Sequence, residues 1–290
     1  MSRLPPERTE PESIEQPDKR TGTSALGDEA STRKTIPVLS IVIPAYNEAE
    51  NLIERLETLD EYLSREVPDT QVAIVDDGSD DATPELVEEF CLTHSRFALI
   101  RSPHRGKAGA VATGVMAAEG KYVLFMDMDM ATSIEHIGEF VGVLEEGEAD
   151  IVAASREAPG AVRLDAPWLR RLLGRGFNVL VQVLLLPGVT DTQCGFKAFT
   201  KTAAHDLFGS LIVFDDTEVV TGPRVTAFDV ELLVAARRRG YRIEQRGVRW
   251  RHTQTRRVHV VKEPIRMLRQ LLSVWINDRR HRYDRRPASK

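Results

Sequence analysis

Two aspartates separated by one residue, Asp127 and Asp129, directly follow an apolar segment from Tyr122 to Met126. If that segment is a strand and its extended geometry continues through the pair, both carboxylates point to the same face. Carboxylate oxygens are the ligands that Mg²⁺ and Mn²⁺ take from proteins, and Mg²⁺ usually keeps substrate phosphate oxygens as further ligands. The pair therefore predicts a divalent-metal site that also holds a phosphorylated substrate.

Three further polar clusters follow apolar segments of the chain. They are Pro44-Ala-Tyr-Asn-Glu48, the acidic run Asp76-Asp-Gly-Ser-Asp-Asp81, and His104-Arg-Gly-Lys-Ala-Gly-Ala110. In the acidic run, the carboxylates of Asp76 and Asp77 can accept hydrogen bonds from ribose hydroxyls or base N–H groups. Asp80 or Asp81 is equally well explained as a cap of the next helix.

The basic pair Arg105 and Lys107 lies where a helix is expected to begin. A helix N-terminus disfavours cations, so this pair is expected to serve another partner, and a bound diphosphate is the natural one. Four polar clusters that each follow an apolar segment indicate one binding site.

The segments that must position these clusters alternate in type. The expected strands are Val38–Ile43, Gln71–Val75, Phe97–Ile100, Tyr122–Met126 and Asp150–Ala154, and the expected helices are Glu48–Leu63, Thr83–Thr93, Lys107–Glu119 and Ser133–Glu145. Thr83 is expected to cap its helix, with Pro84 at the first helical position. Near-continuous apolar strands that alternate with helices predict an α/β fold with a mostly parallel sheet covered on both faces. Ligands of such sheets bind beyond the carboxyl ends of the strands, where the four clusters fall.

The second half of the chain is less regular. We expect a helix at Pro167–Leu186, a loop and short strand at Asp191–Thr200, a helix at Asp229–Arg239, a strand at Tyr241–Trp250 and a helix at Lys262–Arg282. The last helix has an apolar side, comprising Ile265, Leu268, Leu271, Leu272, Trp275 and Ile276, and basic flanks. This pattern predicts an interfacial helix on an anionic membrane surface. The alternatives are a helix packed on its own domain, or a contact in a homodimer.

Composition sets the domain organisation and excludes some functions. Residues 1–35 are polar and rich in Pro, which predicts a disordered tail; residues 36–255 form the folded domain, and residues 256–290 the basic C-terminal helix and tail. A net charge of −5 argues against bulk nucleic-acid binding. Cys91 and Cys194 are expected to be free thiols. The polar first stretch is unlike a secretory leader, and the longest apolar run, Phe177–Val189, is short for a membrane span.

The four clusters together resemble family-2 glycosyltransferases of the GT-A fold, a Rossmann-like architecture. Three downstream stretches narrow the resemblance to dolichyl-phosphate β-glucosyltransferases and related polyprenyl-phosphate glycosyltransferases, with the dolichyl-phosphate mannosyltransferases as close relatives. These stretches are Ala154-Ser-Arg156, Asp191-Thr-Gln-Cys-Gly-Phe-Lys-Ala-Phe199 and Ala227-Phe-Asp-Val-Glu-Leu-Leu233.

The resemblance implies a role for each matched residue. Pro44, Tyr46, Glu48, Asp76 and Asp77 would hold the nucleoside, Lys107 the diphosphate, and the Asp127-Met128-Asp129 motif the donor with Mg²⁺ or Mn²⁺ on its two carboxylates. On the acceptor side, Arg156 and Lys197 would face the acceptor phosphate, and Asp229 and Glu231 would lie near the reaction centre.

The implied reaction is inverting transfer of a hexose from UDP-glucose, or next GDP-mannose, to a polyprenyl phosphate. Such an enzyme would be peripheral at the cytoplasmic face of a membrane. A phosphate acceptor is largely ionised at neutral pH and needs little help from a base, whereas a sugar hydroxyl would need Asp229 or Glu231 to take its proton. A soluble or sugar-hydroxyl acceptor and a non-catalytic nucleotide-sugar-binding protein remain as alternatives.

Overall fold

The computed structural model describes residues 37–165, 168–214, 227–252 and 262–284. The expected disordered tail at 1–35 lies outside these residues. The domain boundaries at 36–255 and 256–290 therefore stay predictions.

Nine strands and eight helices are found in the described residues. The strands are β1 (Leu39–Ala45), β2 (Thr70–Asp76), β3 (Phe97–Arg101), β4 (Tyr122–Met126), β5 (Ile151–Ser155), β6 (Val162–Leu164), β7 (Phe196–Thr200), β8 (Ile243–Gly247) and β9 (Arg249–Arg251). The helices are α1 (Leu52–Glu66), α2 (Thr83–Thr93), α3 (Gly106–Ala117), α4 (His136–Glu145), α5 (Trp168–Leu184), α6 (Lys201–Phe208), α7 (Phe228–Arg238) and α8 (Lys262–Arg279).

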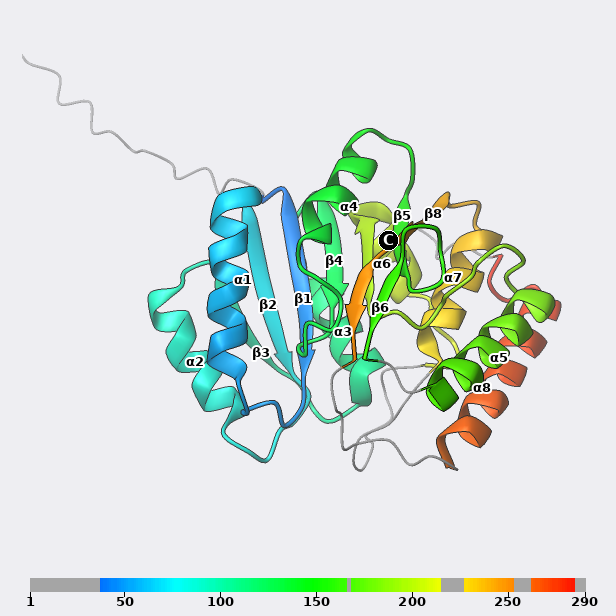
Figure 1. Ribbon diagram of the computed structural model, residues 1–290, viewed down its shortest axis with the longest axis horizontal. Coiled ribbons are helices and arrows are strands. Elements are labelled where there is room, and N and C mark those ends of the chain that lie inside the picture. The colour runs from blue at the N-terminus through cyan, green and yellow to red at the C-terminus, as the bar shows by residue number, and fades with distance from the viewer. Residues whose placement is uncertain (1–36, 166–167, 215–226, 253–261, 285–290) are drawn as a thin grey trace, which may run out of the picture. The chain divides into compact units, whose positions relative to one another are not determined.

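Seven strands form the central sheet in the order β3-β2-β1-β4-β7-β5-β8. Figure 1 shows β2, β1 and β4 side by side within it. β1 pairs in parallel with β2 on one side and with β4 on the other. The loops after these strands and after β3 therefore meet at one edge of the sheet, as the alternation of apolar segments predicts. The expected α/β fold with a mostly parallel sheet is confirmed.

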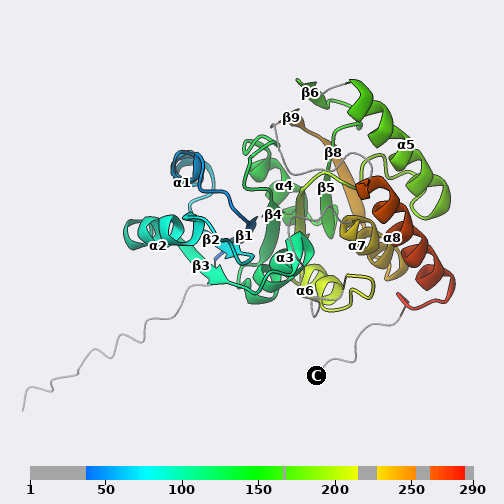
Figure 2. The same ribbon diagram turned by 90° about the horizontal axis from the view of Figure 1, so that it is seen from below.

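Helices cover both faces of the sheet, and each face has its own apolar core (Figure 2). One core is built with α1, α2 and α4, where every third or fourth residue of α1 is buried: Leu52, Leu56, Leu59 and Leu63. The other core is built with α3, α6, α7 and inward side chains of α5 and α8. Burial of each large apolar side chain contributes about 1.5–3 kcal/mol to this arrangement.

The central part of the sheet departs from the expected parallel pattern. β7 runs antiparallel to both β4 and β5. The helix α6, which follows β7 directly and begins with Thr200 as its N-cap, was not expected from the sequence. Because β7 lies between two strands, its residues Phe196 to Phe199 are all buried, including a lysine.

Two local expectations were wrong. The expected strand Tyr241–Trp250 divides into β8 in the main sheet and β9, which pairs with β6 in a separate two-stranded sheet. The N-cap of α2 is Ala82, and Thr83 is instead the first helical residue. The Thr83 hydroxyl accepts a hydrogen bond from the Glu48 amide at 2.8 Å, so it joins two loops at the site edge.

The C-terminal helix α8 is part of the folded core and also presents an apolar outer side. Leu271 and Val274 are buried against the fold, and Asp278 forms a two-pronged ion pair with Arg238 of α7. Figures 1 and 2 both show α8 beside α5. The two helices expose large apolar side chains: Val179, Val183, Leu184, Ile265, Leu268 and Leu272. Among the helices of the described ranges, none is long and apolar enough to cross a membrane.

Candidate active site

The Asp127-Met128-Asp129 motif forms a turn at the end of β4 rather than an extension of the strand. The Met130 amide donates to the Asp127 carbonyl at 3.1 Å, and Met130 has a φ of 50°. This turn buries the Met128 side chain in the apolar core, so that side chain is not available to a ligand. The expected extended geometry was therefore wrong, although both aspartates still lie beyond the carboxyl end of a central strand.

Lys107, in the first turn of α3, makes an ion pair with Asp127. The two side chains keep 31% and 38% of their surface exposed, so the pair is open to a ligand. Burial lowers the pKa of Lys107, but the carboxylates of Asp127, Asp229 and Asp129 outweigh this and leave the pKa raised. The electrostatic influence of three carboxylates, two directly after β4 and one in α7, thus acts on one ammonium group.

Asp77 organises the loops that flank this pair. Its carboxylate accepts the Arg105 amide at 2.8 Å and contacts Nδ1 of His104 at 2.8 Å. The Tyr46 ring stacks on His104 with a centroid distance of 4.2 Å. Burial raises the pKa of Asp77, and the hydrogen bonds from Arg105 and His104 offset only part of this rise. The Asp77 carboxylate therefore stabilises these loops, rather than making the ribose contact that was expected of it.

The remaining nucleoside-side residues lie at the same edge. Asp76 is nearly buried and accepts the Ser79 amide at 3.2 Å. Pro44 is near the end of β1, and Glu48 follows it with its carboxylate 3.4 Å from Arg55. Two more carboxylate contacts belong to Asp81, which accepts the amides of Thr83 and Ala49 at 2.9 and 3.2 Å. Asp81 therefore joins the start of α2 to the loop after β1, although the N-cap position itself is Ala82.

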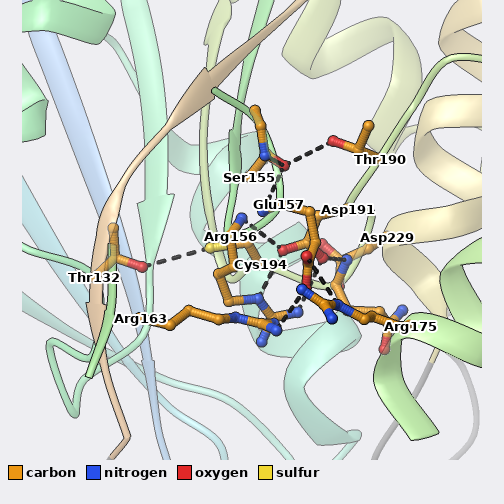
Figure 3. Close-up of polar contacts among 12 residues, drawn as sticks. Thr132, Ser155, Arg156, Glu157, Arg163, Arg175, Thr190, Asp191, Cys194 and Asp229 are labelled. Carbon is orange, nitrogen blue, oxygen red and sulfur yellow. Dashed lines mark hydrogen bonds and ion pairs between the residues drawn. The ribbon is translucent and has the colours of Figure 1, made fainter. Parts of the chain in front are cut away.

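Arg156 is held by Asp191, which follows α5 in the chain. Its Nε and Nη2 atoms donate to the two carboxylate oxygens at 2.7 and 2.9 Å, and its amide donates at 2.9 Å (Figure 3). Burial raises the pKa of Asp191, but Arg156 outweighs burial and holds the pKa below its ordinary value. Much of the guanidinium that was expected to face an acceptor phosphate is therefore used inside the protein.

Lys197 is fully buried in the middle of β7. Its ammonium donates to the Asp229 carboxylate at 2.5 Å and to the Cys194 carbonyl at 2.6 Å. It also lies 5.3 Å from the centroid of the Phe125 ring. The structure does not present Lys197 to an acceptor phosphate, because the side chain has no exposed surface.

Glu231 does not share the surroundings of Asp229, although both begin α7. It accepts the amides of Ile212, Val213 and Phe214 at 2.8–3.1 Å and the Tyr283 hydroxyl at 2.9 Å. Burial raises the pKa of Glu231, and these donors offset part of the rise. The expected place of Glu231 near the reaction centre is corrected: its carboxylate joins a loop and the C-terminal segment to α7.

A group of arginines near Arg156 was not singled out from the sequence. Arg163 of β6 and Arg175 of α5 both pair with Glu157, at 2.6 and 3.2 Å (Figure 3). Arg156 and Arg163 also lie over the Trp250 ring, at 5.4 and 5.9 Å from its centroid. Arg163 and Arg175 lie 6 and 18 residues from Glu157 in the chain, and the pairing of β6 with β9 brings Trp250 to Arg163.

The residues at the end of β4 fit a divalent cation in one respect. Asp127 and Asp129 supply hard oxygen ligands, and Asp127 already neutralises a cation, the Lys107 ammonium. Among the residues that the structure describes, no group of three or more His, Cys, Asp or Glu side chains could hold a metal by itself. Further ligands would therefore have to come from substrate and water, as is usual for Mg²⁺ with phosphates.

Sequence relatives share most of this chain. It is 34% identical to glycosyltransferase AglD of Haloferax volcanii over 82% of the chain, and spans only 37% of that protein's length. It is 33% identical to dolichyl-phosphate beta-glucosyltransferase ALG5D of Trichomonas vaginalis, covering 83% of the chain and 77% of the relative.

A solved structure shares the fold. Glucosyl-3-phosphoglycerate synthase from Mycobacterium tuberculosis, in complex with Mn²⁺, UDP and glucosyl-3-phosphoglycerate, superposes with a TM-score of 0.56 at 20% identity, over 83% of this chain and 80% of that one. This likeness confirms the expected GT-A-like architecture. Residues 40–208 match the family model of glycosyl transferase family 2. The chain therefore belongs to glycosyltransferase family 2.

Proposed function

We propose that this protein is an inverting hexosyltransferase that moves a sugar, glucose before mannose, from a nucleoside-diphosphate donor to a polyprenyl phosphate. The observation that supports this most is the ion pair of Lys107 with Asp127 at the carboxyl edge of the sheet, beside the loop that carries Gly195. Relatives that carry the name dolichyl-phosphate beta-glucosyltransferase match across most of the chain and suggest the sugar and the acceptor.

The donor would lie across the loops after β1, β2 and β3. Asp76, Glu48 and the backbone near Pro44 would contact the nucleoside, and Tyr46 would offer an aromatic face supported by His104. Asp77 would act indirectly, by fixing the loop that carries Arg105 and leads to Lys107. This division follows from burial, since the Asp77 carboxylate is enclosed by protein donors.

Charge on the departing diphosphate would be stabilised from two directions. Mg²⁺ or Mn²⁺ on Asp127 and Asp129 would supply Lewis-acid stabilisation of the leaving group. Lys107 would give the diphosphate a charge-assisted hydrogen bond in place of its present contact with Asp127.

The acceptor would need no strong general base. A phosphate monoester is already largely ionised at neutral pH and can attack the anomeric carbon as it stands. Asp229 accepts a hydrogen bond from the buried ammonium of Lys197, and this contact favours a positioning role for Asp229. For the acceptor phosphate, Arg163 and Arg175 beside Arg156 are the better candidates than Lys197, with Glu157 as their present counter-ion.

A lipid acceptor requires the enzyme to reach a membrane surface. The exposed apolar side chains of α5 and α8 lie on neighbouring helices, with Arg175 and Arg269 also on these two elements. Apolar and basic side chains together suit an anionic bilayer surface. We therefore infer peripheral attachment, at the cytoplasmic face where nucleotide sugars would be met.

The test is transfer from a panel of nucleotide sugars to a short-chain polyprenyl phosphate in the presence of Mn²⁺, read by mass spectrometry. The matched control is the same polyprenol without its phosphate. We expect a hexosylated lipid only with the phosphate. Transfer to small phosphorylated or hydroxyl acceptors, with none to the lipid phosphate, would favour the soluble-acceptor alternative.

A further inference from the structure

Gly195 brings the loop before β7 directly against the Asp127–Lys107 pair. A Cβ built on Gly195 would lie 2.6 Å from Cγ of Asp127 and 2.7 Å from Nζ of Lys107, and closer still to a carboxylate oxygen of Asp127. In proteins, Cβ atoms essentially never lie within 3.0 Å of a non-bonded heavy atom. Only a glycine therefore allows the backbone and the carboxylate to occupy these places together.

The loop from Asp191 to Gly195 is fixed from both ends. At one end Asp191 is fully buried and accepts Arg156 through both carboxylate oxygens and the Gln193 amide at 3.1 Å. At the other end the buried Lys197 ammonium donates to the Cys194 carbonyl at 2.6 Å and is itself held by Asp229. Buried ion pairs of this kind are costly to break, so the loop has little freedom to withdraw.

The Asp127 carboxylate is the part that can move. It keeps 38% of its surface exposed, whereas Asp191 and Lys197 have none. The Lys107 side chain keeps 31% of its surface exposed and can move together with Asp127. A methyl group at position 195 would therefore displace Asp127 toward solvent rather than displace the loop.

We propose that Gly195 is a positioning residue, and that the Asp191–Gly195 loop is a rigid wall that sets the place of the metal-binding carboxylate of Asp127. Arg156 and Lys197 are the two anchors of this wall. The inference rests on the proposed function for the identity of the metal-binding carboxylates. It gives the two buried cations a role on the donor side of the site.

The experiment compares Gly195→Ala with the wild-type protein for binding of Mn²⁺, by electron paramagnetic resonance, with and without UDP. We expect Mn²⁺ to bind in the presence of UDP at least tenfold more weakly to the variant than to the wild type. Raising Mn²⁺ should restore the donor KM. Gly142→Ala in α4, where an added Cβ meets no atom within 4 Å, is the matched control and should bind Mn²⁺ as wild type does.

A second variant separates the wall from an acceptor role and covers the case in which Gly195→Ala does not fold. Arg156→Lys keeps the charge but loses the two-pronged contact with Asp191. With no acceptor present, we expect Mn²⁺ to bind several-fold more weakly to Arg156→Lys and with wild-type affinity to Arg163→Lys. Unchanged Mn²⁺ affinity in both Gly195→Ala and Arg156→Lys would overturn the inference. Failure of the wild type to bind UDP or GDP with Mn²⁺ would instead overturn the proposed function.

Discussion

Asp129 offers the most direct test of the metal pair at the scale of a single residue. Asp129→Ala should lower kcat/KM on the order of 10²-fold or more, because a Lewis acid contributes several kcal/mol to the transition state. EDTA should abolish transfer by the wild type, and added Mn²⁺ or Mg²⁺ should restore it. Asp165→Ala, which removes an exposed aspartate, is the control. Full activity in EDTA would rule out the metal requirement.

Replacement of Lys107 should weaken the binding of UDP and strengthen the binding of Mn²⁺. Lys107→Met removes a charge-assisted hydrogen bond to the diphosphate, worth roughly 1.5–3 kcal/mol, so UDP should bind about 10- to 100-fold more weakly. Mn²⁺ alone should bind more tightly, because Asp127 loses its internal counter-ion. Calorimetry with each ligand separately measures both effects, and Lys121→Met, at the exposed residue before β4, is the control. An unchanged UDP affinity would remove Lys107 from the donor site.

Glu231 should matter for stability and for its pH dependence. Glu231→Gln cannot accept all four hydrogen bonds from Ile212, Val213, Phe214 and Tyr283, so unfolding free energy should fall by about 1–3 kcal/mol. Because burial raises the pKa of Glu231 above its ordinary 4.5, the folded state favours the protonated form. The wild type should therefore lose stability relative to the variant as pH rises from 4.5 through the raised pKa.

Urea unfolding of both proteins over a pH series measures this difference, with transfer activity as the second readout. We expect the folded variant to keep kcat near that of the wild type, since Glu231 contacts structural partners. A folded Glu231→Gln protein with normal stability and lost transfer would return Glu231 to the reaction centre.

The sequence predicted the positions of single residues at strand ends better than it predicted which charged residues form ion pairs. Asp127 and Lys107 are each next to a strand or helix end, so local pattern was enough to place them at one edge. Arg156 and Asp191, or Lys197 and Asp229, are more than 30 residues apart, and nothing local reveals that they neutralise one another. In a single sequence, a cation of a buried ion pair looks the same as a cation of a binding site. Arg156 and Lys197 were therefore expected to be phosphate ligands.

The sequence predicted the elements of the regular first half and the helices α5, α7 and α8, but it did not predict how the strands of the second half pair. β1 to β5 and α1 to α4 follow apolar periodicity, and their boundaries shift by only a few residues. β7 was expected as a short strand, but its antiparallel insertion between β4 and β5 was not expected. This insertion depends on tertiary pairing, which the local sequence pattern does not reveal. The division of β8 from β9 was missed for the same reason, since β9 pairs with β6 rather than with the main sheet.

The neighbouring helices α5 and α8 lead to a prediction about membranes. Replacement of Leu268 and Leu272 by Ser should release the protein from anionic liposomes in a flotation assay, because both side chains are exposed. Trp275 is a poor choice for this test, since it is partly buried against the core. Leu92→Ser, on the exposed side of α2, is the control.

The same double variant should keep its activity on a short, water-soluble acceptor. Liposome binding that stays unchanged would remove α8 from the membrane contact. Loss of both activities with a lowered melting temperature would show that these two leucines stabilise the fold.

At the scale of the whole molecule, one sheet edge carries the proposed chemistry and the α5–α8 side carries the proposed lipid contact. The Asp191–Gly195 loop, β7 and α7 are joined by one side chain. Lys197 of β7 donates to the Cys194 carbonyl of the loop and to the Asp229 carboxylate of α7. This arrangement would hold a donor at the loops and admit a lipid phosphate near the arginines of β6 and α5.

Inverting transfer to a lipid phosphate fixes the configuration of the product at the anomeric carbon, so the product itself is the decisive readout. The lipid product made from UDP-glucose, a short-chain polyprenyl phosphate and Mn²⁺ can be examined by proton and phosphorus NMR. We expect a hexose joined to the lipid phosphate through its anomeric carbon in the β-configuration, opposite to that of the α-linked donor. An α-linked sugar phosphate, or a sugar joined to anything other than the phosphate, would contradict inverting transfer to a lipid phosphate.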